Sequence, residues 1–160
     1  MKRKAVYPGS FDPITYGHVD IIKRASIIFD EITVAVAHNL DKEPLFSVQE
    51  RVVMLKKATT SLKNVKIDDF KGLAVDYVKN KGIHVIVRGL RMISDFEYEF
   101  QMALTNRKLN SSIETIFLMP SENYSYISSK LIKEAAFLGA NLKGFIPSFV
   151  EKELLKKINK

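Results

Sequence analysis

The stretch that decides the fold is residues 7–18, YPGSFDPITYGH, which joins a short apolar segment to a helical pattern. Gly9 permits a sharp turn or a close approach of the backbone to a ligand, while Pro8 and Pro13 restrict the loop. His18 lies in the first turn of the predicted helix, where exposed N–H groups and the helix dipole favour a phosphate group. We therefore expect a phosphate-binding turn between the first strand and the first helix.

This turn differs from the two common phosphate-binding loops. Neither Gly-x-Gly-x-x-Gly nor a loop ending in Gly-Lys-Ser/Thr occurs in the chain. An imidazole at His18 would serve as a hydrogen-bond donor to the anion, but a histidine after a glycine is also typical of a helix cap or a surface group. Asp12 is more typical of a turn-forming side chain than of a general base. At this point both interpretations of His18 stay open.

Beyond this turn, apolar segments alternate between strand and helix patterns. Five short runs predict buried strands, at residues 5–7, 32–37, 65–70, 84–87 and 115–119. Helical spacing predicts helices near residues 21–29, 48–59, 73–81, 96–104 and 129–139, with a final amphipathic helix over the basic residues 151–160. Such alternation with short connections predicts an α/β fold: a Rossmann-like, doubly wound, five-stranded parallel sheet with helices on both faces.

Three of the helix starts carry the same capping pattern, a serine followed three residues later by a glutamate. In such a box each side chain accepts a hydrogen bond from an otherwise unpaired backbone N–H group of the first turn. The three pairs are Ser47 with Glu50, Ser94 with Glu97, and Ser148 with Glu151.

The composition limits the possible architectures and reactions. With 160 residues, of which 46% are hydrophobic, we expect a single domain over residues 1–160. No signal-like or membrane-spanning apolar run occurs, which leads us to expect a cytoplasmic protein. The chain contains no cysteine, so disulfides, thiolate nucleophiles and zinc–thiolate sites are excluded.

The charge balance favours an anionic partner. Lysine and arginine number 25 against 18 aspartates and glutamates, which raises the local concentration of anions. A phosphorylated small molecule and a nucleic acid are both compatible with this excess. The basic residues are scattered and the aromatic residues mostly have core spacing, which speaks against a nucleic-acid-binding module.

Polar residues follow four of the predicted strands, and the carboxyl ends of parallel strands meet at one edge of a sheet. This predicted cluster comprises Gly9, Ser10, Gly17, His18, His38, Lys42, Arg88, Gly89, Arg91 and residues 121–129. Arg88 and Arg91, three residues apart, suit bidentate phosphate binding.

Four further side chains also have ordinary interpretations. His84, at a strand entrance, is expected to be structural, and His38 receives no role. Lys42 is also compatible with a solvated loop charge, and Glu99, on a helix face, with a solvated carboxylate.

Three segments resemble the nucleotidylyltransferase superfamily. Residues 8–18, PGSFDPITYGH, resemble its first signature, and residues 127–134, ISSKLIKE, resemble its second. Residues 88–99, RGLRMISDFEYE, resemble the segment that marks its bacterial phosphopantetheine adenylyltransferase family. The resemblance extends over essentially the whole chain.

The resemblance implies transfer of the adenylyl group of ATP to 4′-phosphopantetheine, giving dephospho-coenzyme A and pyrophosphate. It implies that Ser10, Lys42, Ala74 and Arg88 bind the acceptor. It implies ATP contacts from Ser10, Phe11, His18, Gly89, Leu90, Arg91, Glu99, Tyr124, Ser125, Tyr126, Ile127, Ser128, Ser129 and Lys130. Ser10 replaces a threonine found in many members and keeps its hydroxyl, whereas Lys130 replaces a common third serine and adds a positive charge.

The chemistry of such a transfer fits these side chains. The acceptor phosphate is already an anion, so positioning and electrostatic stabilisation matter more than a general base. His18, Lys42, Arg91 and Ser129 suit the catalytic role of donors, and Mg²⁺ would arrive on the ATP phosphates, with its direct ligands unknown. We expect direct displacement without a covalent enzyme intermediate.

Other interpretations make different predictions. A nucleotidylyltransferase acting on nicotinate mononucleotide or using CTP is the nearest alternative, and residues 88–99 speak against it. Two further alternatives are a nucleic-acid-binding module and a catalytically silent relative with a regulatory role. The resemblance also implies a homohexamer, whereas feedback by coenzyme A stays open.

Overall fold

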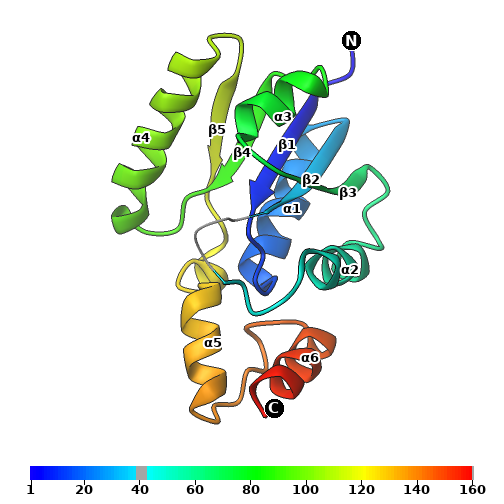
Figure 1. Cartoon of the computed structure of the whole chain (residues 1–160), viewed down its shortest axis with the longest axis vertical. Coiled ribbons are helices and arrows are strands. Elements are labelled where there is room, and N and C mark those ends of the chain that lie inside the picture. The colour runs from blue at the N-terminus through cyan, green and yellow to red at the C-terminus, as the bar shows by residue number, and fades with distance from the viewer. Residues whose placement is uncertain (39–42, 160) are drawn as a thin grey trace.

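The computed structural model of the chain describes residues 1–38 and 43–159. A single five-stranded parallel sheet, in the order β3-β2-β1-β4-β5, forms its centre (Figure 1). The strands are β1 (Lys4–Gly9), β2 (Glu31–Ala37), β3 (Val65–Phe70), β4 (Val85–Gly89) and β5 (Glu114–Leu118). All five predicted strands are confirmed, with ends that differ from the prediction by at most two residues.

The chain builds the sheet outward from β1 to β3 and then crosses back to β4, so the strand order reverses between β1 and β4. Strand β1 pairs with β2 along its whole length, from Lys4 to Gly9. With β4, on its other side, β1 forms only the pair of Val6 with Ile86. The two central strands therefore separate toward their carboxyl ends. In open α/β sheets this reversal point is where ligands bind.

Six helices connect and flank the strands in the described part of the chain. They are α1 (Tyr16–Ile28), α2 (Val48–Ala58), α3 (Ala74–Asn80), α4 (Ile93–Leu109), α5 (Ser129–Phe137) and α6 (Ser148–Ile158), with a short 3₁₀ turn η1 (Glu122–Tyr124) before α5. Helices α5 and α6 lie beyond the carboxyl ends of the strands (Figure 1). Within the described residues, no helix combines the length and apolarity that crossing a bilayer requires.

Two apolar cores confirm that helices cover both faces of the sheet. On one face, Tyr7 and Val34 pack in a cluster that includes Ile22 of α1 and Leu55 of α2. On the other face, the neighbouring strand residue Val6 packs with a smaller cluster to which α3 contributes. Because successive side chains of a strand point to opposite faces, this alternation follows directly from the sequence of β1.

One of the three predicted capping boxes is confirmed. Ser47 accepts from the Glu50 N–H at 3.2 Å, and Glu50 accepts from the Ser47 N–H at 2.7 Å. The box at Ser94 is wrong, because the N-cap of α4 is Met92, two residues earlier, and the Asp95 carboxylate accepts from the Met92 N–H.

The third predicted box is wrong for a related reason. Ser148 is already the first residue of α6, with Pro147 before it and no side-chain cap. Glu151 instead accepts from the Leu142 N–H at 3.4 Å. A pattern of residue types does not by itself fix the helix start to the residue.

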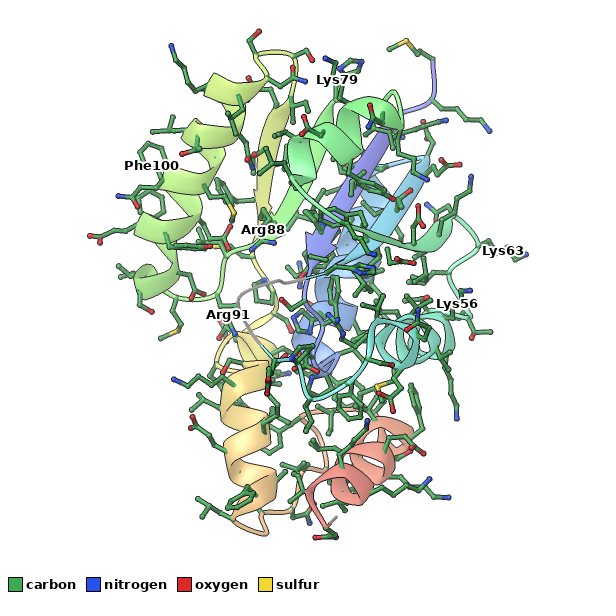
Figure 2. The ribbon with its side chains drawn as sticks, viewed as in Figure 1. Lys56, Lys63, Lys79, Arg88, Arg91 and Phe100 are labelled. Carbon is green, nitrogen blue, oxygen red and sulfur yellow. The ribbon has the colours of Figure 1, made fainter. Side chains whose placement is uncertain are left out.

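The apolar residues of α4 do not form a core within this chain. Phe96 and Phe100 stack with ring centroids 5.5 Å apart, and each is 47% exposed. Phe100 lies on the side of α4 turned away from the sheet (Figure 2). The prediction that the spacing of these aromatic residues places them in the core is therefore wrong for the single chain. The buried residue of α4 is Glu99.

Candidate active site

The loop between β1 and α1 forms a compact turn at the carboxyl end of β1. Phe11 has a φ of +49°, a left-handed conformation that costs a non-glycine residue about 1–2 kcal/mol. Its ring is 2% exposed and meets the rings of Tyr7 and His18 edge-on, at centroid distances of 5.2 and 5.1 Å. A Cβ atom at Gly9 would lie 3.0 Å from this ring, so any larger residue would have to displace the ring slightly.

His18 acts as a helix cap and also remains a candidate donor. Its Nδ1 accepts from the Thr15 N–H at 3.0 Å, while the Thr15 hydroxyl accepts from the His18 N–H at 3.4 Å. With Nδ1 used as an acceptor, the proton of the neutral ring is on Nε2. Burial, together with the charges of Arg91 and Arg88, lowers the pKa of His18 to about 3. The site thus presents a neutral N–H donor next to two arginines.

Arg88 occupies the gap where β1 and β4 separate. Its Nε and Nη2 donate to the Glu99 carboxylate at 2.9 and 2.7 Å, and Nη1 donates to the Pro8 carbonyl at 2.7 Å. Burial alone would lower the pKa of Arg88, but the bond to the Glu99 carboxylate raises it. Glu99 is 8% exposed, so its interpretation as a solvated carboxylate is wrong. The apolar periodicity of the helix did not indicate the burial of Glu99, because this burial depends on Arg88, which lies outside the helix and eleven residues earlier.

Arg91 connects the start of α4 to the segment before α5. Its Nη1 donates to the Ile127 carbonyl at 2.8 Å, and its Nε pairs with Asp95 at 3.2 Å. Figure 2 shows Arg88 at the end of β4 and Arg91 close to the upper end of α5. The two guanidinium groups therefore border the same region beyond the strand ends.

The first turn of α5 is fastened to the β1–α1 loop. Ser128 caps the helix by accepting from the Leu131 N–H at 3.1 Å, and the Ser129 hydroxyl donates to the Pro13 carbonyl at 2.7 Å. One turn later, Lys133 pairs with Asp12 at 2.9 Å. The second signature segment is thus held directly against the first.

Asp12 does more than form a local turn. Its carboxylate also accepts from the N–H groups of Leu45 and Phe46, both at 2.9 Å, and its side chain is 8% exposed. The interpretation as a turn-forming side chain is wrong, because the carboxylate binds another loop and another helix. Nothing in the local sequence around Asp12 indicates these remote partners.

The remaining predicted ATP-side residues lie around the same edge. Leu90 donates its N–H to the Leu118 carbonyl at 2.9 Å, and a Cβ atom at Gly89 would lie 3.6 Å from the Tyr7 hydroxyl. The rings of Tyr124 and Tyr16 pack together, with their centroids 6.0 Å apart. Ser125 caps the end of η1, Ile127 is buried, and Tyr126 and Lys130 are exposed.

On the acceptor side, Ala74 begins α3 just beyond the end of β3, and Ser10 lies in the β1–α1 loop. Lys42 lies outside the described residues. His38 pairs with Asp69 at 2.6 Å near the ends of β2 and β3. His84 lies at the opposite end of the sheet, with Nδ1 3.2 Å from the Ser112 carbonyl oxygen, as expected for a structural residue.

Sequence reasoning missed Arg51, Lys133 and Tyr7. Arg51 is 1% exposed although it is charged, and Tyr7 is 5% exposed with its pKa raised to about 12, chiefly by burial. For Arg51 a signal existed, since it lies four residues before Leu55 on the apolar side of α2. Within residues 1–38 and 43–159, no group of three or more His, Cys, Asp or Glu side chains could hold a metal ion.

Comparison with known proteins connects this geometry to a family. A family model described as cytidylyltransferase-like matches residues 6–135. A phosphopantetheine adenylyltransferase of Caldanaerobacter subterraneus is 56% identical over 158 residues, 99% of each chain. A phosphopantetheine adenylyltransferase of Clostridium novyi is 54% identical over 99% of this chain and 98% of its own.

Two solved structures share the fold at low sequence identity. A putative nicotinate-nucleotide adenylyltransferase of Vibrio parahaemolyticus has a TM-score of 0.70 and 18% identity, covering 100% of this chain and 98% of its own. A bifunctional NMN adenylyltransferase/ADP-ribose pyrophosphatase of Francisella tularensis, in complex with AMP and a manganese ion, has a TM-score of 0.72 and 15% identity. The alignment covers 100% of this chain and 50% of that one. At this identity the two likenesses establish the doubly wound fold alone.

Proposed function

The chain belongs to the phosphopantetheine adenylyltransferase family of cytidylyltransferase-like proteins, and from this premise we propose that it transfers the adenylyl group of ATP to 4′-phosphopantetheine. The products are dephospho-coenzyme A and pyrophosphate, which makes the reaction a step of coenzyme A biosynthesis. The observation that carries the proposal is the placement of Arg88 and Arg91 at the strand-order reversal, where Arg88 binds the Pro8 carbonyl before the loop that leads to His18 and Arg91 binds the Ile127 carbonyl before α5.

The reaction is a direct in-line displacement at the α-phosphorus of ATP. A phosphate oxygen of the acceptor forms the new P–O bond, and the bond to the oxygen that bridges the α- and β-phosphates breaks as pyrophosphate leaves. The attacking phosphate is an anion at neutral pH, so no side chain has to remove a proton. The chain's task is to bring two anions together and to stabilise the charge that develops on the leaving group.

His18, Arg91, Ser129 and Lys42 supply this stabilisation. The Nε2–H of His18 is a donor that remains neutral, so it stabilises charge without depending on a protonation step. Ser129 donates its single proton to the Pro13 carbonyl here, and it exchanges this partner for a phosphate oxygen when ATP binds. Gly89, Leu90, Glu99 and residues 124–130 surround the remainder of ATP.

Ser10, Lys42, Ala74 and Arg88 bind the acceptor. A guanidinium has five N–H donors, of which the described contacts of Arg88 use three, on Glu99 and Pro8. The other two are available to a phosphate oxygen while the bidentate bond to Glu99 fixes the plane of the group. Arg88 thus anchors the acceptor phosphate from the separated ends of β1 and β4.

Mg²⁺ enters as a companion of the ATP phosphates. The described residues offer no group of three or more carboxylate or imidazole side chains that would hold the ion. Mg²⁺ commonly binds substrate phosphates and keeps several of its waters, so it does not need an all-protein cage. No residue of this chain is assigned as its ligand.

The protein works as a cytoplasmic homohexamer, with dephospho-coenzyme A or coenzyme A as product or feedback ligand. The exposed apolar side chains of α4 and of the neighbouring β5 support assembly, because contiguous patches of this kind typically mark protein interfaces. These side chains include Ile93 at 92%, Phe96 and Phe100 at 47% each, and Ile116 at 38% exposure. Multi-angle light scattering of the purified chain measures the assembly directly, and a monomer would contradict it.

Pyrophosphate release tests the proposed function. The chain is mixed with Mg²⁺ and ATP, and 4′-phosphopantetheine or nicotinate mononucleotide is supplied separately. Release with 4′-phosphopantetheine alone, together with dephospho-coenzyme A in the product, is expected. Release with the mononucleotide alone would contradict the acceptor, and substitution of CTP for ATP tests the nucleotide in the same assay.

A further inference from the structure

Arg51 is a buried cation that the proposed chemistry does not use. It lies in the first turns of α2 and is the largest of the fully buried side chains, with 1% exposure. In the part of the chain that the structure describes, its hydrogen bonds all go to backbone carbonyl oxygens and it forms no ion pair. Burial lowers the pKa of its guanidinium, which nevertheless stays protonated, as arginine does in proteins.

The carbonyls that Arg51 binds come from three separate segments. Nη1 donates to Ser10 at 2.7 Å in the β1–α1 loop and to Ala37 at 3.3 Å at the end of β2. Nε donates to Phe46 at 3.1 Å and more weakly to Ser47 at 3.4 Å, at the start of α2. One planar group therefore fixes the β1–α1 loop relative to the next strand end and the next helix.

A buried cation that binds only carbonyls is a poor device for stability alone. Desolvation of the charge costs free energy that an apolar side chain of similar volume would not incur, and the attraction of the nearby Asp12 carboxylate offsets only part of this cost. The Ser10 carbonyl, however, belongs to the peptide that precedes Phe11, whose φ of +49° requires support from its surroundings. At 2.7 Å the bond to Ser10 is the shortest that Arg51 makes.

We propose that Arg51 is a positioning residue for adenylyl transfer, which holds the Ser10–Phe11 peptide in the orientation that binds the acceptor phosphate and supports His18. The inference rests on the proposed function. Through the backbone, Arg51 sets the place of the Ser10 side chain on the acceptor side. Through Phe11, whose ring lies 5.1 Å from that of His18, it also sets the place of the donor.

The test compares Arg51→Lys and Arg51→Gln with the wild type. Lysine keeps the charge but loses the planar fork, so it can replace one of these bonds and not the set. We expect kcat/KM for 4′-phosphopantetheine to fall about tenfold in the lysine variant and about 10²-fold in the glutamine variant, since small misplacements near the reacting groups have effects of this size. The dissociation constant of ATP, measured by calorimetry, should change by less than about threefold, because most of the proposed nucleotide contacts lie in residues 89–91 and 124–130, to which Arg51 makes no hydrogen bond.

Thr59→Val provides the matched control at the other end of α2. Thr59 is 4% exposed and its hydroxyl donates to the Leu55 carbonyl at 2.8 Å, so the variant also removes a buried hydrogen bond from this helix. The Thr59→Val variant should have a lower melting temperature but unchanged values of kcat/KM for 4′-phosphopantetheine and of the dissociation constant of ATP. The lysine variant serves as the measured case if the glutamine variant does not fold.

Three outcomes separate the possible failures. An active wild type with both Arg51 variants unchanged in KM and kcat, whatever their melting temperature, would overturn the positioning role. Acceptor and ATP affinities that fall together, in step with the folded fraction, would overturn it as well. A wild type that releases no pyrophosphate with 4′-phosphopantetheine would contradict the proposed function, and the inference about Arg51 would fall with it.

Discussion

The β1–α1 loop and helix α4 reach the same edge of the sheet, but they are held there by different means. The loop is fixed by polar contacts on every side: Arg51 binds the Ser10 carbonyl, Asp12 pairs with Lys133, and Ser129 binds the Pro13 carbonyl. Helix α4 carries exposed aromatic residues and is fastened to the site chiefly by the pair of Glu99 with Arg88. The loop is thus held by several polar contacts within one chain, whereas α4 has one buried ion pair at the site and an exposed apolar side.

The largest effect is expected in the loop, from His18→Ala. Removal of a donor aimed at developing charge typically lowers kcat by about 10²–10³, and ATP affinity should change far less. Steady-state kinetics with 4′-phosphopantetheine measure this loss. The control is His84→Ala at the opposite end of the sheet, which should leave kcat unchanged. A His18 variant that turns over like the wild type would remove His18 from the mechanism.

On the α4 side, Glu99→Gln should have the next largest effect. It removes the carboxylate from a largely buried arginine, which typically costs about 3 kcal/mol when one partner of such a pair is lost. We expect a melting temperature lower by about 8 °C and a KM for 4′-phosphopantetheine raised about tenfold. Glu97→Gln, an exposed residue on the same helix, is the control and should change neither value.

A smaller effect, on assembly, is expected from Phe100→Lys. If the exposed side of α4 packs against another copy, each buried phenylalanine contributes about 1.5–3 kcal/mol to that contact. Light scattering should then show a smaller species at concentrations at which the wild type is a hexamer. Ile27→Lys on α1 changes an exposed apolar residue elsewhere and should leave the mass unaltered. An unchanged mass for the Phe100 variant would separate α4 from the interface.

The smallest effect concerns the protonation of His18 in the free protein. Its folded pKa of about 3 lies below the unfolded value near 6.5, so the folded state binds fewer protons between these values. The free energy of unfolding should therefore fall as the pH drops from about 6.5 toward 3, and His18→Gln should weaken that dependence. NMR of labelled imidazole should show the Nε2–H tautomer without titration between about pH 5 and 8. A titration of His18 near 6.5 would contradict the neutral donor.

The loop and α4 also differ in how much of their structure could be predicted from the sequence alone. The succession of strands and helices along the chain and the Ser47 cap follow from local patterns, because alternation and capping depend on residues close in the chain. The burial of Glu99 and the partners of Asp12 could not be predicted this way. Glu99 meets Arg88 eleven residues away, and Asp12 meets Lys133 across 121 residues, so only the folded chain brings them together.

Arg51 is an intermediate case. Its place on the apolar side of α2 indicated burial, but the carbonyls that it binds lie in other segments and have no signature in the sequence. The aromatic residues of α4 led to the opposite error, since helical spacing alone does not distinguish a buried side of a helix from an exposed apolar side. Function at this edge therefore depends on contacts that local patterns do not encode.

The stereochemical course at the α-phosphorus tests the central claim most directly. The chain is supplied with 4′-phosphopantetheine and one diastereomer of adenosine 5′-(1-thiotriphosphate), and the configuration of the thio-substituted dephospho-coenzyme A is determined. Direct displacement predicts complete inversion. Retention would show two successive displacements through an adenylyl-enzyme, and the absence of any dephospho-coenzyme A product would contradict the acceptor; either result would overturn the account.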